Sequence, residues 1–429
     1  MKAFLRKMNA FVLLAVMICS TGPAAVSADW FWPVDDPVNE STIPALSDLV
    51  LINRPGFTDR LNRYAWSMTV FKDELYVGTW NTLGFYIREP SNGAQVFRYV
   101  DGIAWDQVVD AGLYNKNNQG LRTMVVWDDP DDAPDKGPAI YGTTMNAEDG
   151  LEVWRTFDGD NWEVVVGDGS PYPNGFYAGP ENDSGRGMQV YECEGTEWIY
   201  LGTRGYHGGE LWRTDDGVTW EKVTDALSLG LGSGSIAMAT MCVYRDDPQM
   251  PPALFVGTWG LGGFNVVKTY DGLHFETVAH RGLNRRTSQG VAKLIVFDGK
   301  LWLLGINYVY GFEIYTAGPG RIDGDEDWET VATDGLTDKN NLYAWNAIVY
   351  DNGTGPRLYI GTFNNKKGFF LYSMTSDLKY AVEVGPDAPF PSGMGDVRRY
   401  GARSFAIYDG RLIMGLACIY APTQIWMGW

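Results

Sequence analysis

Short apolar segments alternate with polar turns along nearly the whole chain, and one version of this pattern recurs at regular intervals. Its most constant part is an apolar run that ends in glycine, usually in Gly-Thr. Seven copies occur, at residues 75–79, 140–143, 199–203, 254–258, 302–305, 358–362 and 412–415. A second apolar run precedes each copy. Short apolar runs bounded by turn residues are typical of β-strands, so the pattern predicts a repetitive all-β chain.

A second signature lies between these glycines. It consists of a strand with an aromatic residue, a turn containing Asp-Gly, and another aromatic residue that starts a short strand. The clearest copy is at residues 210–223; others are at 154–162 and 268–275, and looser ones at 97–105, 323–328 and 376–380. Aspartate can accept hydrogen bonds from its own turn and glycine permits positive φ. Because the signature recurs, we interpret these turns as structural.

Each repeat therefore contains four predicted strands. Four strands in a repeat of about 50 residues are typical of a propeller blade. We predict a seven-bladed β-propeller of four-stranded antiparallel blades, formed by residues 45–429 as a single domain. The seventh repeat ends after its third strand, at residues 424–426. We expect residues 48–52 to supply the missing strand, so that the last blade is closed by an N-terminal strand and no sheet edge stays free.

The Asp-Gly turns and aromatic residues of residues 210–223 and 154–162 resemble the Asp-box (BNR-repeat) motif of the sialidase-like β-propeller superfamily. That superfamily includes sialidases, other glycoside hydrolases and non-enzymatic receptors. The resemblance covers most of residues 45–429. It implies the propeller architecture and a ligand site at the propeller axis, whereas the chemistry differs among members.

The N-terminal residues have the pattern of a secretory signal peptide. Basic residues in 1–7 precede an apolar run at 10–18, and small residues follow up to Ala28. We predict a signal peptide at 1–28 with cleavage near Ala28, an N-terminal extension at 29–44, and a secreted or extracytoplasmic protein. The apolar run is too short to span a membrane as a helix. A lipid anchor at Cys19 is not expected, because Ile18 precedes it.

The net charge of the chain limits the kinds of molecule that it is expected to bind. The formal net charge is −19, and removal of the three basic residues of 1–28 lowers it to −22. A chain this acidic should repel nucleic acid and anionic membranes as a whole, so an anionic ligand needs a local basic pocket.

Repetition also separates candidate sites from scaffold. A polar position near the third strand recurs in six repeats, as Gln95, Glu152, Glu210, Asn265, Glu313 and Gln424. We interpret it as structural, because buried polar groups need hydrogen-bond partners. The repeats differ instead in the segments that enter the first strand and in the loops after the glycine-ended strand. There the predicted ligand-binding residues are Arg63, Arg122, Arg186, Arg204, His207, Arg285, Tyr308, Arg399 and Arg403.

Arginine and aromatic side chains suit a polar or anionic saccharide-like ligand, since guanidinium groups pair bidentately with carboxylate, sulfate or phosphate. We therefore predict axial binding of such a glycan, of another small ligand or of a surface protein. The alternative is a glycoside hydrolase or polysaccharide lyase acting on an anionic glycan. Polysaccharide lyases also occur on seven-bladed propellers. Such an enzyme would need an arginine to neutralise charge and a histidine or tyrosine as the base. Arg204, Tyr206 and His207 are the candidates for those roles.

The sequence predicts no metal site and no cofactor. The three histidines, His207, His274 and His280, are too dispersed for a multi-histidine centre. Acidic loops at 128–132 and 323–327 offer oxygen ligands, and structural calcium is the alternative there. Neither loop has a complete calcium-binding spacing, so we interpret both as solvated acidic turns.

Overall fold

The computed structural model describes residues 42–83, 90–100, 102–129, 137–232 and 234–429. The predicted signal peptide at 1–28, Cys19 and most of the predicted extension lie outside these ranges. Within them, every helix is too short or too polar to cross a bilayer.

The chain is all-β, and its strands follow the sequence repeat. Each repeat gives a unit of consecutive antiparallel strands. Units one to three contain β2 (Asn62–Phe71), β3 (Glu74–Asn81), β4 (Val96–Val100) and β5 (Ala104–Gln107); β6 (Gly120–Trp127), β7 (Ala139–Met145), β8 (Val153–Thr156) and β9 (Glu163–Val166); β10 (Asn182–Cys193), β11 (Thr196–Gly205), β12 (Glu210–Thr214) and β13 (Glu221–Asp225).

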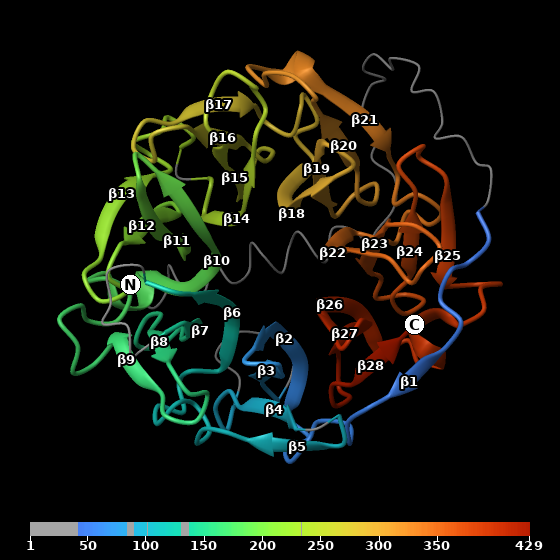
Figure 1. Cartoon of the computed structure of the whole chain (residues 1–429), viewed down its shortest axis with the longest axis horizontal. Coiled ribbons are helices and arrows are strands. Elements are labelled where there is room, and N and C mark those ends of the chain that lie inside the picture. Colours follow the sequence, from blue (N-terminus) through green and yellow to red (C-terminus); the bar gives the residue numbers. More distant parts are fainter. Residues whose placement is uncertain (1–41, 84–89, 101, 130–136, 233) are drawn as a thin grey trace.

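Units four to seven continue in the same order around the axis (Figure 1). They contain β14 (Ala237–Tyr244), β15 (Ala253–Trp259), β16 (Val266–Thr269) and β17 (Glu276–Ala279); β18 (Ser288–Phe297), β19 (Lys300–Asn307), β20 (Ile314–Ala317) and β21 (Trp328–Ala332); β22 (Tyr343–Tyr350), β23 (Arg357–Phe363), β24 (Leu371–Met374) and β25 (Tyr380–Val384); β26 (Arg399–Tyr408), β27 (Arg411–Cys418) and β28 (Ile425–Gly428). Short 3₁₀ segments η2 (Gly179–Glu181), η3 (Asp325–Asp327) and η4 (Ser392–Gly395) lie in connections.

The prediction of a seven-bladed β-propeller with separate four-stranded blades is wrong, because the strands form one 28-stranded sheet. The second strand of each unit pairs with the first strand of the next, as in Trp80↔Gly120 and Phe363↔Gly401. These bridges close the first and second strands of all units into a 14-strand antiparallel barrel, with 14 outer strands attached to it. The bridges use backbone groups, which any side chain can accompany, so the sequence repeat does not reveal them.

The ring closes between the two ends of the described chain. β1 (Leu49–Leu51) pairs with β28 in the register Leu49↔Gly428 to Leu51↔Trp426. The N-terminal strand thus lies where residues 48–52 were expected, on the outside of the last unit (Figure 1). On the inner side, Tyr64 of β2 bridges Ala417 of β27. Both contacts join segments more than 300 residues apart, so the barrel has no free edge between its first and last units.

The hydrophobic core lies between neighbouring units rather than within one unit. One cluster combines Phe71 and Tyr76 of the first unit with Leu121, Ile140 and Trp154 of the second. Burial of such side chains contributes roughly 1.5–3 kcal/mol each. Neighbouring units therefore share their hydrophobic clusters.

The Asp-Gly turns are structural, as predicted. The Asp216 carboxylate accepts hydrogen bonds from the backbone amides of Val218 and Thr219, at 2.7 and 2.5 Å, and from the Thr214 hydroxyl at 3.0 Å. Gly217 has φ +71°. It packs directly against the Tyr141 hydroxyl of the preceding unit, so this turn also fixes the contact between two units.

The recurring polar position is structural as well. In the second unit, the Glu152 carboxylate accepts hydrogen bonds from Asn118 at 2.6 Å and from Trp154 at 2.8 Å. In the third unit, Glu210 accepts one from Trp212 at 3.0 Å and another from Asn182. These carboxylates hold the segment that enters the first strand against the third strand, which accounts for their recurrence.

We expect acid to destabilise the fold through these turns. Partial burial opposes ionisation of Asp158 and Asp271, but backbone amide donors outweigh it and hold the pKa of both carboxyls below the usual 3.8. The pKa of Asp216 is lowered in the same way. A carboxyl group whose pKa is lower in the folded than in the unfolded state stabilises the fold fully above the unfolded-state pKa. This stabilisation is lost as the pH falls from the unfolded-state pKa through the folded-state pKa. The melting temperature should therefore decrease when the pH is lowered below about 4.

Circular dichroism melts between about pH 7 and about pH 2.5 will check this. The control is Asp216→Asn, which keeps an oxygen acceptor but cannot titrate. It should be less stable at neutral pH and lose less stability in acid. Parallel curves for the variant and the wild type would contradict the assignment.

Candidate anion-binding cavity

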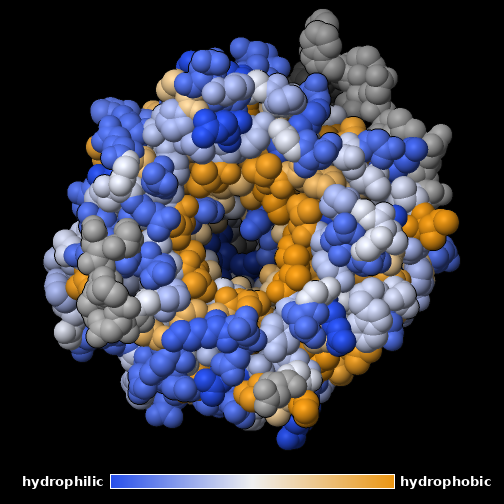
Figure 2. All heavy atoms as spheres, in the orientation of Figure 1, coloured by the Kyte–Doolittle hydropathy of each residue, from blue (hydrophilic) through white to orange (hydrophobic). Residues whose placement is uncertain are grey.

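A cavity of about 640 Å³ lies on the axis of the barrel and is lined by the first strands of all seven units. Figure 2 shows it as a central hollow with hydrophobic residues around its rim and hydrophilic residues deeper inside. Methionines from four consecutive units contribute to the apolar part of its lining: Met68, Met124, Met188 and Met241. The cavity therefore combines an apolar wall with a polar interior.

A β-bulge in each first strand directs one extra side chain toward this cavity. The register shifts at an equivalent place in every unit, for example between Leu121 and Thr123 and between Ala402 and Ser404. One residue is skipped each time: Trp66, Arg122, Arg186, Ala239, Ala292, Trp345 and Arg403. We call these seven residues the bulge ring. All seven line the cavity, as expected because a bulge re-aims the extra side chain.

The glycine-ended strands make room for the bulges. Gly415 pairs with Ser404, the residue that follows the bulge in β26. A Cβ atom at Gly415 would overlap Met68, Ser404 and Ala65. Gly78 similarly pairs with Ser67 and has no room for a Cβ. The recurring glycine is therefore needed where the first strands of two units approach the second strand closely.

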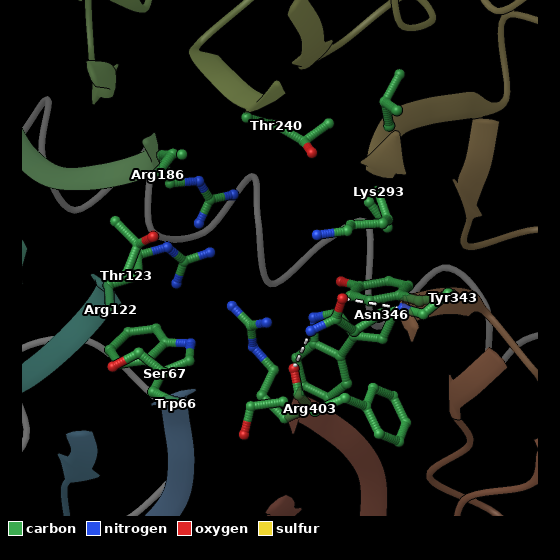
Figure 3. Close-up of a pocket in the computed structure, with 18 of the residues that line it drawn as sticks. Trp66, Ser67, Arg122, Thr123, Arg186, Thr240, Lys293, Tyr343, Asn346 and Arg403 are labelled. Atoms are coloured by element: carbon green, nitrogen blue, oxygen red, sulfur yellow. Dashed lines mark hydrogen bonds between the residues drawn. The ribbon is translucent and has the colours of Figure 1, made fainter. Parts of the chain in front are cut away.

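Arg122, Arg186 and Arg403 form the basic part of the bulge ring. They belong to β6, β10 and β26, and their guanidinium groups point toward one another (Figure 3). Each stacks on an indole ring: Arg122 on Trp66 at 4.6 Å, Arg186 on Trp259 at 4.8 Å and Arg403 on Trp345 at 5.4 Å. Stacking holds each guanidinium plane while leaving its edges free for a ligand.

The Nε atoms of these three arginines have no acceptor in the part of the chain that the structure describes. All three of these atoms are buried. Burial lowers the pKa of Arg186 to about 9 and that of Arg403 to about 10; neighbouring arginines add to the effect at Arg186. Burial and the other arginines also lower the pKa of Arg122 well below its usual value. A guanidinium is not deprotonated in proteins at neutral pH, so three positive charges converge in the cavity.

Two further cations adjoin this trio. Arg204 of β11 pairs with the buried Asp183, donating from Nε to Oδ1 at 2.7 Å and from a terminal nitrogen to Oδ2. Burial disfavours the charge of Arg204, but Asp183 outweighs it and the pKa of Arg204 is raised. Lys293 of β18 reaches into the cavity from the far side (Figure 3), and burial lowers its pKa. Arg204 is thus paired within the protein, whereas Lys293 brings a further amine to the cavity.

Aromatic residues cover one side of the cavity. Tyr64 and Tyr343 line it and belong to a buried cluster that also contains Trp80, Phe363 and Tyr400. The Tyr64 and Tyr400 hydroxyls are in direct contact. Burial raises the pKa of both Tyr64 and Tyr343, so these phenols stay neutral at physiological pH.

The lining contains no carboxylate and no histidine among the described residues. Hydrolysis of a glycosidic bond ordinarily uses two carboxyl groups at a set separation. The described residues contain no group of three or more His, Cys, Asp or Glu side chains that could hold a metal ion. The cavity as it stands is suited to binding an anion.

The structure brings together four of the predicted ligand-binding residues: Arg122, Arg186, Arg204 and Arg403. The other five lie elsewhere. Arg63 is directed to the carbonyls of Thr82 and Leu83, Arg285 pairs with Glu313 at 3.3 Å, and Arg399 donates to the Met394 carbonyl at 2.7 Å. The Tyr308 hydroxyl contacts that of Tyr343, and His207 pairs with Glu181 at 3.3 Å.

The three catalytic candidates do not form one cluster in the cavity. The His207 side chain is 78% exposed on a loop after β11, and only Arg204 lines the cavity. The backbone amide of Tyr206 donates to the Glu181 carbonyl. Lys293, Thr240 and Asn346 line the cavity but were not predicted. Each directly follows a bulge-ring residue, a signal that becomes visible only once the bulges are known.

The acidic loops are engaged within the protein where they are described. The Asp323 carboxylate pairs with Arg321 at 2.7 Å and Lys268 at 3.5 Å, and Asp327 accepts the backbone amides of Asp323 and Gly324. In the other acidic loop, residues 130–132 lie outside the described residues. The calcium alternative gains no support from the described part.

Comparison with known proteins gives no family assignment. No family model matches the chain, and neither does any curated protein. Two similar solved structures are a proposed exo-β-1,3-galactanase from Bifidobacterium bifidum s17 and a proposed glycosidase from Bacteroides thetaiotaomicron VPI-5482. The first is 14% identical in sequence, with a TM-score of 0.36, and the alignment covers 66% of this chain and 96% of the galactanase chain. The second is 12% identical with TM-score 0.37, covering 92% and 94%. The resemblance to the Asp-box sialidase-like superfamily stays a prediction.

Proposed function

We propose that this protein binds an anionic, saccharide-like ligand in the axial cavity. One observation carries the proposal: Arg122, Arg186 and Arg403 converge there, and their buried Nε atoms have no hydrogen-bond partner among the described residues. An unpaired buried donor costs about 1–3 kcal/mol, and more when it is charged. A carboxylate, sulfate or phosphate group would supply the missing acceptors and offset the mutual repulsion of the guanidinium groups.

The surroundings of the trio favour an organic anion over a bare ion. Indole rings and methionines line the same cavity as the cations, and Thr240 and Asn346 add neutral hydrogen-bonding groups. Ligand pockets that orient a small molecule typically combine an apolar lining with a few convergent polar groups. Export from the cytoplasm through residues 1–28 is part of this proposal and would place the site where extracellular glycans occur.

Calorimetric titration with a matched panel tests the proposal. We expect oligosaccharides bearing uronate, sialate or sulfate groups to bind, and the same oligosaccharides without the anionic group to bind at least about tenfold more weakly. The affinity should fall as salt rises, because the contact is ionic. Equal affinity for charged and neutral members, or binding by neither, would refute an anion site.

Cleavage of the bound glycan by hydrolysis or by a lyase reaction is the alternative. Since no carboxyl or imidazole group lines the cavity among the described residues, we expect no product from the ligands that bind. Chromatography of each glycan after prolonged incubation measures this directly. Product formed by the wild type but not by an Arg186→Met variant would show that the cavity belongs to an enzyme.

A further inference from the structure

The bulge ring is strongly asymmetric around the axis. Arginine or tryptophan occupies the ring position in units six, seven, one, two and three, whereas units four and five have Ala239 and Ala292. The strands that carry these alanines, β14 and β18, lie across the axis from β2 (Figure 1). The two smallest side chains therefore lie next to each other, opposite Trp66.

The alanines leave room where the other units fill the ring with long side chains. Both are partly exposed although they lie deep in the barrel, because they face the cavity. Of the other ring residues, Trp66 is buried, whereas Trp345 and the three arginines are partly exposed as well. Because an alanine side chain ends at Cβ, the bulge ring itself is more open on the side of units four and five.

Polar side chains, one of them a lysine, flank this space. Thr240 and Lys293 directly follow the two alanines, and Gln189 and Asn346 come from the adjoining units. The Gln189 amide nitrogen donates to the Val190 carbonyl at 3.0 Å, which leaves its side-chain oxygen for another donor. Hydroxyl, amide and ammonium groups around an apolar floor suit the hydroxyls and ring face of a sugar.

We propose that Ala239 and Ala292 form a second subsite, which receives the pyranose ring of a sugar whose acidic group is held by Arg122, Arg186 and Arg403. This inference rests on the proposed function and adds the orientation of the ligand: acid toward units seven, two and three, ring toward units four and five. It also assigns specificity to two alanines that make no polar contact themselves.

Side chains that fill this space should separate the two subsites. The variants are Ala239→Leu and Ala292→Leu, and the probes are inorganic sulfate and D-glucuronate, titrated against the full chain by calorimetry. We expect each variant to bind glucuronate at least about tenfold more weakly, because leucine occupies the volume of part of the ring. Sulfate affinity should change less than about twofold, since the arginines are untouched. The controls Ala239→Ser and Ala292→Ser should bind both probes like the wild type.

The possible results test the second subsite separately from the anion site. Unchanged glucuronate affinity in the leucine variants, or an equal loss for both probes, would overturn the second subsite. If the wild-type protein binds sulfate but not glucuronate, the second subsite is also refuted, whereas the anion site is still supported. Binding of neither probe would refute the anion site itself. If a leucine variant does not fold, the smaller Ala239→Val and Ala292→Val changes decide by the same criteria.

Discussion

Replacing Arg122, Arg186 or Arg403 singly with methionine will weaken binding of an anionic ligand by roughly 10- to 100-fold, because each charged hydrogen bond contributes about 1.5–3 kcal/mol. The same substitutions will raise the thermal midpoint of the ligand-free protein. Each arginine has a lowered pKa in the folded state, so its charge opposes folding at neutral pH. Methionine fills similar volume without that charge.

Arg204 provides the matched control for this prediction. It lines the same cavity but is neutralised by Asp183, whose side chain is 1% exposed. Arg204→Met should therefore lower the thermal midpoint, because it leaves a buried carboxylate without its partner; breaking such a pair costs about 3–5 kcal/mol. Calorimetric titration and differential scanning calorimetry measure both effects. Destabilisation by Met at all four positions would show that the trio has a structural role instead.

A methyl group at Gly159 or Gly217 will destabilise the fold by roughly 2–5 kcal/mol, which combines the penalty for positive φ with that for overpacking. Gly159 has φ +86° and Gly217 has φ +71°. A Cβ atom at these positions would overlap the hydroxyl of Tyr76 or Tyr141 in the preceding unit. Both glycines therefore combine a left-handed backbone with a close contact between units.

Gly299 allows the two contributions to be separated. Its φ is +72°, but a Cβ there would have no neighbour within 4 Å. Gly299→Ala should cost only the conformational part, roughly 1–2 kcal/mol. Urea titrations of Gly159→Ala, Gly217→Ala and Gly299→Ala compare the free energies of unfolding. Equal losses in all three would mean that the tyrosine contacts contribute nothing.

Local chemistry was readable from the sequence. The Asp-Gly turns, the glycine-ended strands and the all-β character depend on residues close together in the chain, and turn geometry limits which residues can stand there. The recurrence of Glu152 and Glu210 correctly marked them as scaffold, since an equivalent contact is made in each unit. The pairing of residues near 50 with the last strand was also accessible, because the final repeat lacks its fourth strand.

The pairing of strands between neighbouring units could not be predicted from the sequence. Pairs such as Trp80↔Gly120 and Ile306↔Tyr343 join units through backbone hydrogen bonds, and the paired side chains share no common type. A count of repeats therefore predicted separate blades, whereas the strand pairing produces one closed barrel with outer strands. Backbone hydrogen bonds leave little trace in side-chain patterns.

The sequence by itself determined the strands, their turns and a set of arginines from which a site could be built. Only the tertiary structure decided which of them meet. Arg122 and Arg403 lie 281 residues apart in the numbering, yet both reach the cavity because each occupies the bulge of a first strand and the barrel closes around one axis. Arg399 precedes Arg403 by four residues and turns instead to the Met394 carbonyl, because it lies at the strand end, before both register shifts of β26. The direction of a side chain depends on register and ring closure, which are properties of the assembled barrel.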